Sequence, residues 1–331
     1  MTGKILKTAA KVVVVALILA FLILAIYRNY AKLSEMEFSF SFWPFLASTL
    51  LILLVFFAQS YAWGNIIGAL ARPLRFRDAA GIWFASQVSK YVPGKVMLPL
   101  VRMTMGRRVG IDIGRTTLSI YLELVMMNGA VVIVFLLSML GWPDSGMWAF
   151  LADKIGMPGG GERLSYLVLL FVPLCLIAIH PKLLEWMINR GLRLLKKNPI
   201  SLTIGYGRVL LLFALQMLAW VIYGLSCWLL MVSLGVDDPA LALRIVGAFT
   251  FSWFIGFVSF VTPGGIGVRE AVLTGLMAMW GFNVGIAMVA AGLARLQWTG
   301  MELVGAALTL RYRPISLDEI KQDHESDQPT A

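Results

Sequence analysis

Apolar runs long enough to cross a membrane recur along this chain, and they limit its fold more than any other feature. Hydrophobic residues make up 59% of the sequence and charged residues 14%. A run of about 18 or more apolar residues is typical of a transmembrane helix. In the bilayer interior every backbone polar group needs a partner within the protein, and a helix supplies it. The sequence therefore predicts an all-α polytopic membrane protein.

Two of the apolar stretches are interrupted near their middle by proline and glycine. The first break is Pro93-Gly94, within 79–106, and the second is Pro263-Gly264-Gly265, within 241–280. Proline removes a backbone donor and disrupts a helix, while glycine tolerates the chain reversal that follows. Backbone freed at membrane depth is tolerated only inside protein or beside a water-filled cavity. Function is therefore expected at these two breaks.

The uninterrupted runs predict the membrane spans. The six spans are expected at about 12–27, 42–70, 115–140, 164–180, 207–234 and 284–309. The basic, amphipathic stretch 181–198 is interpreted as an interfacial helix on the anionic cytoplasmic leaflet, with a simple basic loop as the alternative. Residues 141–163 are expected to form an extracytoplasmic loop, and the polar tail 311–331 to be disordered on the cytoplasmic side.

Loop charge indicates how the two broken stretches meet the membrane. If both turn back within the bilayer, most loop Lys and Arg residues lie on the cytoplasmic side. If both cross fully, Arg107, Arg108, Arg115 and the basic residues of 182–208 move outside, and the two sides become equal. Cytoplasmic loops carry an excess of Lys and Arg, so the pattern favours two re-entrant helical hairpins. Both chain ends are then cytoplasmic.

Re-entrant hairpins give each half of the chain the order span, span, hairpin, span, in opposite orientations. Spacing supports a repeat, because Gly110-xxx-Gly114 follows the first break as Gly281-xxx-Gly285 follows the second. Transporters use inverted repeats and hold substrate near the midplane at broken helices. The predicted fold thus has six spans and two re-entrant hairpins arranged as an inverted repeat. Its halves are residues 1–140 and 164–310.

Charged residues within the apolar stretches are the candidate functional residues. A charge at the bilayer centre costs at least about 2.5–3.5 kcal/mol, so it is generally paired or functional. Arginine and lysine suit a phosphate, as do the helix N-termini that follow the breaks. The residues predicted to bind an anionic headgroup are Lys95, Arg102, Arg269 and Arg295. The carboxylates predicted to couple or gate its movement are Glu123 and Glu270.

Structural roles are the alternatives for some of these charges. Glu123 and Arg295 are assigned equivalent positions in the two halves, so they could instead pair with each other across the repeat. Lys90 and Glu302 lie near the expected ends of their segments, where a long side chain can snorkel to the interface.

No cofactor, metal or catalytic motif is expected. Cys175 and Cys227 are isolated in apolar segments, His180 and His324 form no metal cluster, and neither a Walker A loop nor GxSxG occurs. The net charge of +10 comes from short basic loops beside apolar runs, which argues against nucleic acid as a partner. The chain is therefore expected not to be an enzyme.

The run Pro263-Gly264-Gly265-Ile266-Gly267-Val268-Arg269-Glu270-Ala271, with Arg295, resembles the second signature of the lysylphosphatidylglycerol synthase transmembrane (flippase-like) family. The first signature is matched more loosely by 86–95 with Arg102, Gly110 and Glu123. Many members have Gly and an acid shortly after the first Pro-Gly, whereas this chain has Met97-Leu98-Pro99. That departure shifts weight to Glu123 and Glu270 as coupling carboxylates.

The resemblance, over roughly 10–310, implies a lipid-translocating domain of two inverted halves in a bacterial inner membrane. Bifunctional members add a cytosolic aminoacyl transferase, which this chain is expected to lack. The leading hypothesis is a flippase or scramblase for a lipid with a phosphate-containing headgroup, glycosylated and polyprenyl lipids included. The alternative is a non-transporting scaffold for a glycosyltransferase or envelope-assembly complex. Anionic inner-leaflet lipids are a further expected partner, and homo-oligomer formation is left open.

Overall fold

The computed structural model is helical throughout the part of the chain that it describes, with no β-strand there. The described residues are 39–90, 97–139, 152–154, 156, 170, 172–194, 199, 201–202, 204–259, 265 and 267–309. The all-α prediction is thereby confirmed. The predicted span 12–27, most of 141–163, residues 164–169 and 171 of the predicted span 164–180, and the tail 311–331 lie outside the described residues.

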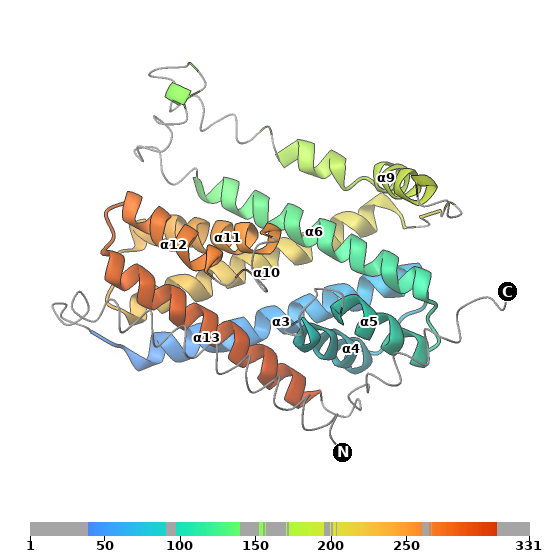
Figure 1. The fold of residues 1–331 in the computed structure, drawn as a ribbon, viewed down its shortest axis with the longest axis horizontal. Helices are drawn as coiled ribbons and strands as arrows, with labels where there is room; N and C mark the ends of the chain where they lie inside the picture. The colour runs from blue at the N-terminus through green and yellow to red at the C-terminus, as the bar shows by residue number, and fades with distance from the viewer. Residues whose placement is uncertain are drawn as a thin grey trace.

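Long apolar helices form the body of the molecule (Figure 1). Within the described residues, four segments are long and apolar enough to cross a membrane. They are α3 (Phe42–Leu70), α6 (Ile113–Met139), α10 (Tyr206–Ser233), and the short 3₁₀ helix η1 (Pro239–Leu241) continued by α11 (Ala242–Val258). Helix α13 (Val284–Leu308) is of similar length, but it carries Arg295 and Glu302 and is not one of the four.

Shorter helices flank the breaks. Helices α4 (Phe76–Ser89) and α5 (Met97–Arg108) lie on either side of 91–96 and pack against each other. Helix α12 (Val268–Met279) packs against α11 in the same way. Because 12–14 residues at 1.5 Å each reach only about 20 Å, none of α4, α5 and α12 spans a core of about 30 Å alone. Helix α11 together with η1 has 20 residues, and at 1.5 Å each they reach about 30 Å.

Helices α3 and α10 run antiparallel and make the most extensive helix contact among the described elements. The amide of Ser41, at the start of α3, donates to the carbonyl of Ser233, at the end of α10, at 2.9 Å. At the opposite end Arg208 Nη2 donates to Asn65 Oδ1 at 3.2 Å. Each predicted half therefore contributes one helix to the centre of the bundle.

The other helices surround this pair in a regular way. Helix α6 packs against α3, α5, α10 and α11, and α13 packs against α10, α12, α3 and α4. Helix α4 also packs on α3, as α11 does on α10. Exchanging α3 with α10, α4 with α11, α5 with α12 and α6 with α13 therefore reproduces the same set of contacts. In Figure 1, α6 and α13 run in opposite directions.

The turn after α5 and the turn after α12 have the same backbone form. Gly110 and Gly281 have φ of 73° and 77°, a left-handed conformation that glycine adopts without cost. In each turn the next residue donates its amide to the carbonyl five residues earlier, at 3.0 and 3.1 Å. Asp112 and Asn283 then begin α6 and α13, each accepting a backbone N–H within that helix, at 2.9 and 2.8 Å.

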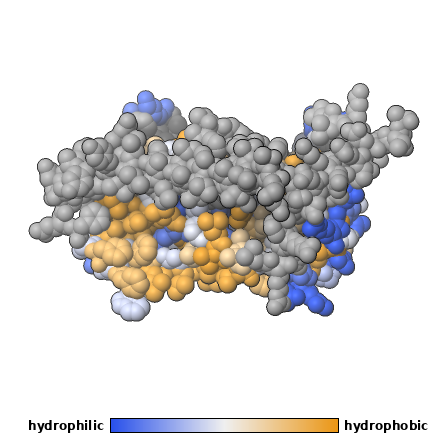
Figure 2. Space-filling model, turned by 60° about the horizontal axis from the view of Figure 1, so that its bottom comes forward, coloured by the Kyte–Doolittle hydropathy of each residue, from blue (hydrophilic) through white to orange (hydrophobic). Residues whose placement is uncertain are grey.

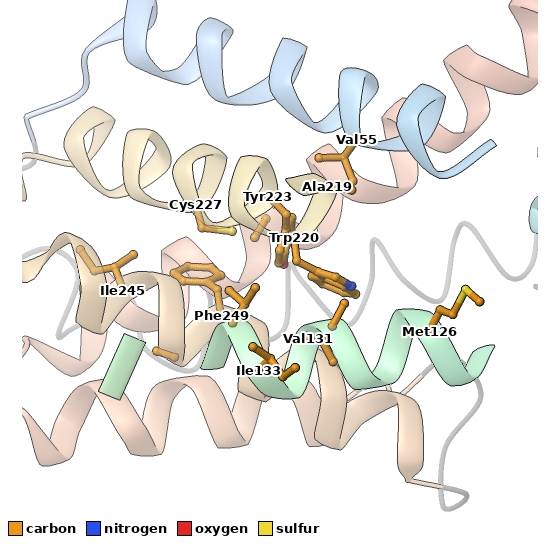
Figure 3. Packing of buried hydrophobic residues seen from close by; sticks show 14 of the residues in the cluster. Val55, Met126, Val131, Ile133, Ala219, Trp220, Tyr223, Cys227, Ile245 and Phe249 are labelled. Atoms are coloured by element: carbon orange, nitrogen blue, oxygen red, sulfur yellow. The ribbon is translucent and has the colours of Figure 1, made fainter. Parts of the chain in front are cut away.

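The main hydrophobic core lies where α3, α6, α10 and α11 meet (Figure 3). Val55, Val131, Trp220 and Phe249 represent the four helices there, and each is at most 2% exposed. Trp220 also donates its indole N–H to the carbonyl of Met127 at 3.1 Å, which satisfies its polar atom in the core. A second cluster of buried residues joins α3 to α4 and α5.

Large hydrophobic side chains also cover the outside of the bundle. Leu50, Leu218, Leu225, Leu303 and Leu308 are each between 44% and 66% exposed. Figure 2 shows a broad hydrophobic surface among the described residues, with hydrophilic residues gathered toward one end. An apolar exterior of this extent fits a multi-pass membrane protein, because lipid tails can contact it.

Candidate functional site

Arg102 of α5 and Glu123 of α6 form a buried ion pair. Arg102 is 0% exposed and Glu123 is 4% exposed. The second carboxylate oxygen of Glu123 accepts the indole N–H of Trp83 at 2.6 Å. Arg102 Nε donates to Ser86 Oγ at 2.9 Å, and its guanidinium lies 4.9 Å from the centre of the Trp63 ring. We call Arg102, Glu123, Trp83, Ser86 and Trp63 the closed cluster.

The closed cluster joins a predicted headgroup ligand to a predicted gating carboxylate. All five of its residues come from α3, α4, α5 and α6, and it engages both oxygens of Glu123. Arg102 Nη2 is buried without a hydrogen-bond partner among the described residues. A pair this deeply buried is costly to break, because either partner alone would leave an uncompensated charge. Its contacts join α4, α5 and α6.

Glu302 of α13 and Lys90, the residue that ends α4, form a second ion pair. The Glu302 side chain is 1% exposed, whereas that of Lys90 is 29% exposed. Trp298, one helical turn before Glu302, donates its indole N–H to the same oxygen at 2.9 Å. Snorkelling to the interface is therefore the wrong interpretation for Glu302. The pair joins the two predicted halves immediately before residues 91–96, which contain the first break.

Two further cations lie near this pair. Arg269, at the start of α12, is 7% exposed and donates to the hydroxyl of Tyr223 in α10. Its guanidinium carbon lies 5.5 Å from the Trp298 ring centre. Arg295 of α13 is 8% exposed, and both arginines are close enough to act electrostatically on Lys90. We call Lys90, Glu302, Arg269, Arg295 and Trp298 the junction cluster.

The structure does not place Glu123 and Arg295 at equivalent positions. Helices α5 and α12 begin at Met97 and Val268, and helices α6 and α13 begin at Ile113 and Val284. In both pairs the two starting residues are the same number of residues apart. By that register Ala294, and not Arg295, corresponds to Glu123. One residue turns a helix by about 100°, so the two side chains leave their helices in different directions. The observed partner of Glu123 is Arg102.

Glu270 stabilises the start of α12. Its carboxylate accepts the backbone N–H of Gly267 at 2.7 Å, in the arrangement of a capping box. The cap satisfies a backbone donor that the helix itself leaves unpaired, and it places negative charge at the positive end of the helix dipole. Because Gly267 has no side chain, the reciprocal bond of a full capping box is absent, and the structural role of Glu270 rests on this one contact. Its gating role stays a prediction.

Of the residues at the breaks, Gly265 is described. Its φ is 69°, and a Cβ there would lie 2.4 Å from the carbonyl oxygen of Gly256 in α11. Glycine is thus required both by backbone conformation and by close contact with α11. The predicted ligand Lys95 and the break residues Pro93, Gly94, Pro263 and Gly264 lie outside the described residues.

Helix α9 (Pro181–Leu194) carries a basic groove of about 580 Å³ at the edge of the bundle. The Arg190 guanidinium lies 5.5 Å from the Trp186 ring centre, and Glu185 accepts the backbone N–H of Leu202 at 2.9 Å. Leu184 on the opposite face is buried. The predicted end of this helix, 195–198, is outside the described residues. The groove is lined by Lys182, Glu185, Trp186, Asn189, Arg190, Arg193 and Leu202.

Sequence reasoning did not identify Trp83, Trp298 and Tyr223 as partners of the buried charges. The spacing of Trp298 and Glu302, four residues apart on one helix, is the signal that could have suggested such a contact. No comparable signal links Trp83 to Glu123, because their contact joins two different helices. Within the described residues, no three His, Cys, Asp or Glu side chains gather as a metal site would require.

Comparison with known proteins identifies the family. A comparison with curated protein sequences gives no significant match. The family model of the lysylphosphatidylglycerol synthase TM region matches residues 8–301, which include both broken stretches, the closed cluster and every member of the junction cluster except Glu302. The chain therefore belongs to the family of the lysylphosphatidylglycerol synthase transmembrane region.

Proposed function

We propose that this protein moves a lipid with an anionic, phosphate-containing headgroup between the leaflets of a bacterial inner membrane, as a flippase or scramblase. The observation that carries the proposal is the junction cluster, where three cations and the carboxylate of Glu302 lie between the two halves of an apolar bundle. Buried arginine and lysine are well suited to a phosphate. Family membership supports a role in lipid handling.

An inverted repeat is part of this proposal. The exchange of α3 with α10, α4 with α11, α5 with α12 and α6 with α13 preserves the helix contacts, and the exchanged α3 and α10 run antiparallel. The matching glycine turns at Gly110 and Gly281 also support an inverted repeat. Antiparallel equivalents are what a two-fold axis in the membrane plane produces, as in many transporters.

The re-entrant hairpins can be tested by cysteine labelling. The native cysteines are first replaced, and single cysteines are then introduced one at a time. The positions Arg77 and Arg108 flank the first broken stretch, and Asp237 and Val284 flank the second. We expect labelling at the first two positions from the cytoplasmic side only, and at the other two from the outside only. If Asp237 and Val284 label from opposite sides, the second broken stretch crosses the membrane.

Helix α9 is proposed to rest on the anionic cytoplasmic leaflet. Lys182, Arg190 and Arg193 line its groove, and Trp186 beside them is 57% exposed. Basic residues and an indole on one face of a helix suit an anionic membrane surface.

Lipid movement in vesicles tests the proposed function. The purified protein is reconstituted into liposomes that contain a trace of headgroup-labelled phosphatidylglycerol, and a membrane-impermeant quencher is added outside. If the protein moves the lipid, the label of the inner leaflet becomes accessible to the quencher, while in protein-free vesicles it stays protected. If it stays protected in the presence of folded protein, transport is excluded for this lipid and the scaffold hypothesis gains.

A further inference from the structure

Glutamines buried in the long helices differ in whether their amides have partners. Among the described residues, Gln59 in α3, Gln216 in α10 and Gln297 in α13 are buried. Gln297 Nε2 donates to Thr49 Oγ1 at 2.8 Å, and its Oε1 accepts from Ser48 Oγ at 3.3 Å. Gln216 is 0% exposed, and neither its Nε2 nor its Oε1 has a hydrogen-bond partner in the part of the chain that the structure describes. The Oε1 of Gln59 lacks a partner there as well.

An unpaired amide is energetically unfavourable inside an apolar bundle. Most buried polar side-chain atoms in proteins have a hydrogen-bond partner, and an atom without one has lost its water and gained nothing in return. Methionine, which is also long and unbranched, would remove this cost at position 216. The Gln216 amide is therefore expected to serve a group that the described part of the chain does not itself supply.

Gln59 and Gln216 lie at the same level of the seam between the two halves. In the antiparallel pair of α3 and α10, the hydroxyls of Ser48 and Ser226 are 3.3 Å apart. Eleven residues after Ser48 comes Gln59, and eleven residues before Ser226 comes Leu215, next to Gln216. Gln216 follows the start of α10 by ten residues, or about 15 Å, which places its amide near the middle of a core of about 30 Å.

The same face of α10 leads from Gln216 to the junction cluster. Tyr223 follows Gln216 by seven residues, which is two helical turns or about 10 Å. Its hydroxyl accepts a hydrogen bond from Arg269, whose guanidinium carbon also lies 5.5 Å from the Trp298 ring centre. A lipid phosphate held by Arg269 would place the rest of its headgroup beside this face of α10.

We propose that Gln216, assisted by Gln59, binds hydroxyl groups of the lipid headgroup when the two halves move apart. An amide offers a donor and an acceptor side by side, which suits a hydroxyl because a hydroxyl both donates and accepts. Since α3 and α10 belong to different halves, rocking of one half against the other changes the seam in which the amides lie. This inference rests on the proposed transport function and names its substrate class, a phospholipid whose headgroup carries hydroxyls beyond the phosphate.

Two lipids of equal charge test the inference by binding. The full chain is purified in neutral detergent and titrated with dioctanoyl phosphatidylglycerol or with dioctanoyl phosphatidylpropanol, whose headgroup has no hydroxyl. We expect the wild-type protein to bind phosphatidylglycerol about tenfold more tightly. Gln216→Met should remove most of this preference by weakening the binding of phosphatidylglycerol alone. Gln297→Met is the matched control, because Gln297 is also buried but has partners, and it should keep the preference.

Thermal unfolding of the lipid-free protein distinguishes a binding amide from a structural one. Gln216→Met removes an unpaired amide, so its midpoint should rise by about 2 °C, whereas Gln297→Met loses hydrogen bonds and its midpoint should fall. A lower midpoint for Gln216→Met with weaker binding of both lipids would mean that the amide holds a structural water or a protein partner, and would overturn the inference.

The remaining outcomes also decide. Equal binding of the two lipids by the wild-type protein, binding of neither, or a preference kept by folded Gln216→Met overturns the inference. If Gln216→Met does not fold, a preference kept by folded Gln59→Met overturns it. Vesicles with acyl-chain-labelled forms of both lipids separate it from the transport function. If the two lipids move equally fast, transport stands and the hydroxyl site falls; if the binding preference holds but neither lipid moves, the site stands and transport falls.

Discussion

The closed cluster and the junction cluster use similar residues in opposite ways. Each has a buried glutamate that accepts an indole N–H and pairs with a cation of the α4–α5 region. In the closed cluster every member belongs to one half, and the cation is fully buried. In the junction cluster the pair joins the two halves, its cation is partly exposed, and two more arginines lie nearby.

We propose that this difference separates a structural ion pair from a binding site. Burial alone does not distinguish them, since Glu123 and Glu302 are 4% and 1% exposed. What distinguishes them is whether the ion pair lies within one half or joins the two halves, and whether its cation is fully buried or partly exposed. The predictions below test that distinction through protein stability, which each cluster should affect to a different extent.

The largest effect is expected from Arg102→Gln. The substitution leaves Glu123 buried without its counter-ion, which should lower the free energy of unfolding by about 3–5 kcal/mol. The measurement is thermal or denaturant unfolding in detergent. Adding Glu123→Gln should restore much of the loss, because the uncompensated charge is then gone. A single variant as stable as the wild-type protein would show that the closed cluster does not hold α4, α5 and α6 together.

A smaller loss is expected from Gly305→Ala, which changes packing at the junction without changing charge. A Cβ at Gly305 would lie 2.1 Å from the ring of Phe84, so α13 must move away from α4. Overpacking of this kind costs about 1–3 kcal/mol, and unfolding measurements should show it. Gly300→Ala is the control on the same helix, since nothing lies within 4 Å of its Cβ position. Equal stability of the two variants would mean that α4 and α13 are not in tight contact.

Lys90→Gln should cost less than Arg102→Gln, about 1–2 kcal/mol. Lys90 is partly exposed, and Trp298 continues to donate its indole N–H to Glu302 after the substitution. The same unfolding experiment compares the two variants directly. A loss as large as that of Arg102→Gln would remove the distinction between the clusters.

The smallest effect is expected on α9, which belongs to neither cluster. Replacing Lys182, Arg190 and Arg193 by Gln should change the free energy of unfolding by no more than about 0.5 kcal/mol for each substitution, because these side chains are exposed. Unfolding in neutral detergent measures this without an anionic surface. A loss comparable to that of Lys90→Gln would show that the α9 groove takes part in the bundle itself.

The sequence predicted the helices well and their contacts poorly. Helices α3, α6 and α10 begin and end within about two residues of the predicted spans, because length and hydropathy decide where a membrane helix lies. The GxxxG spacing also marked Gly110 and Gly281, which the structure places in turns of the same backbone form. Of the charged residues predicted inside the membrane, Glu270 and Lys90 are partly exposed, and the buried ones are Arg102, Glu123, Arg269, Arg295 and Glu302.

Pairing could not be predicted, because it depends on which helix faces come together. Hydropathy does not specify that Arg102 meets Glu123, or that Lys90 reaches across to α13. The residue that corresponds to Glu123 is Ala294, one residue before the predicted Arg295. The GxxxG spacing was too weak a signal to fix the register of the two halves to one residue. The register became clear only from the matching starts of α5 and α12 and of α6 and α13.

The central claim is that cations at the junction of the two halves carry a lipid phosphate across the membrane. Its most direct test is the rate at which labelled phosphatidylglycerol moves between leaflets in vesicles with an Arg269→Gln, Arg295→Gln double variant. The control is an Arg75→Gln, Arg77→Gln double variant, which removes the same charge from the exposed end of α4. Lipid movement should be lost in the junction variant and kept in the control. Movement at the wild-type rate in the folded junction variant would contradict the claim.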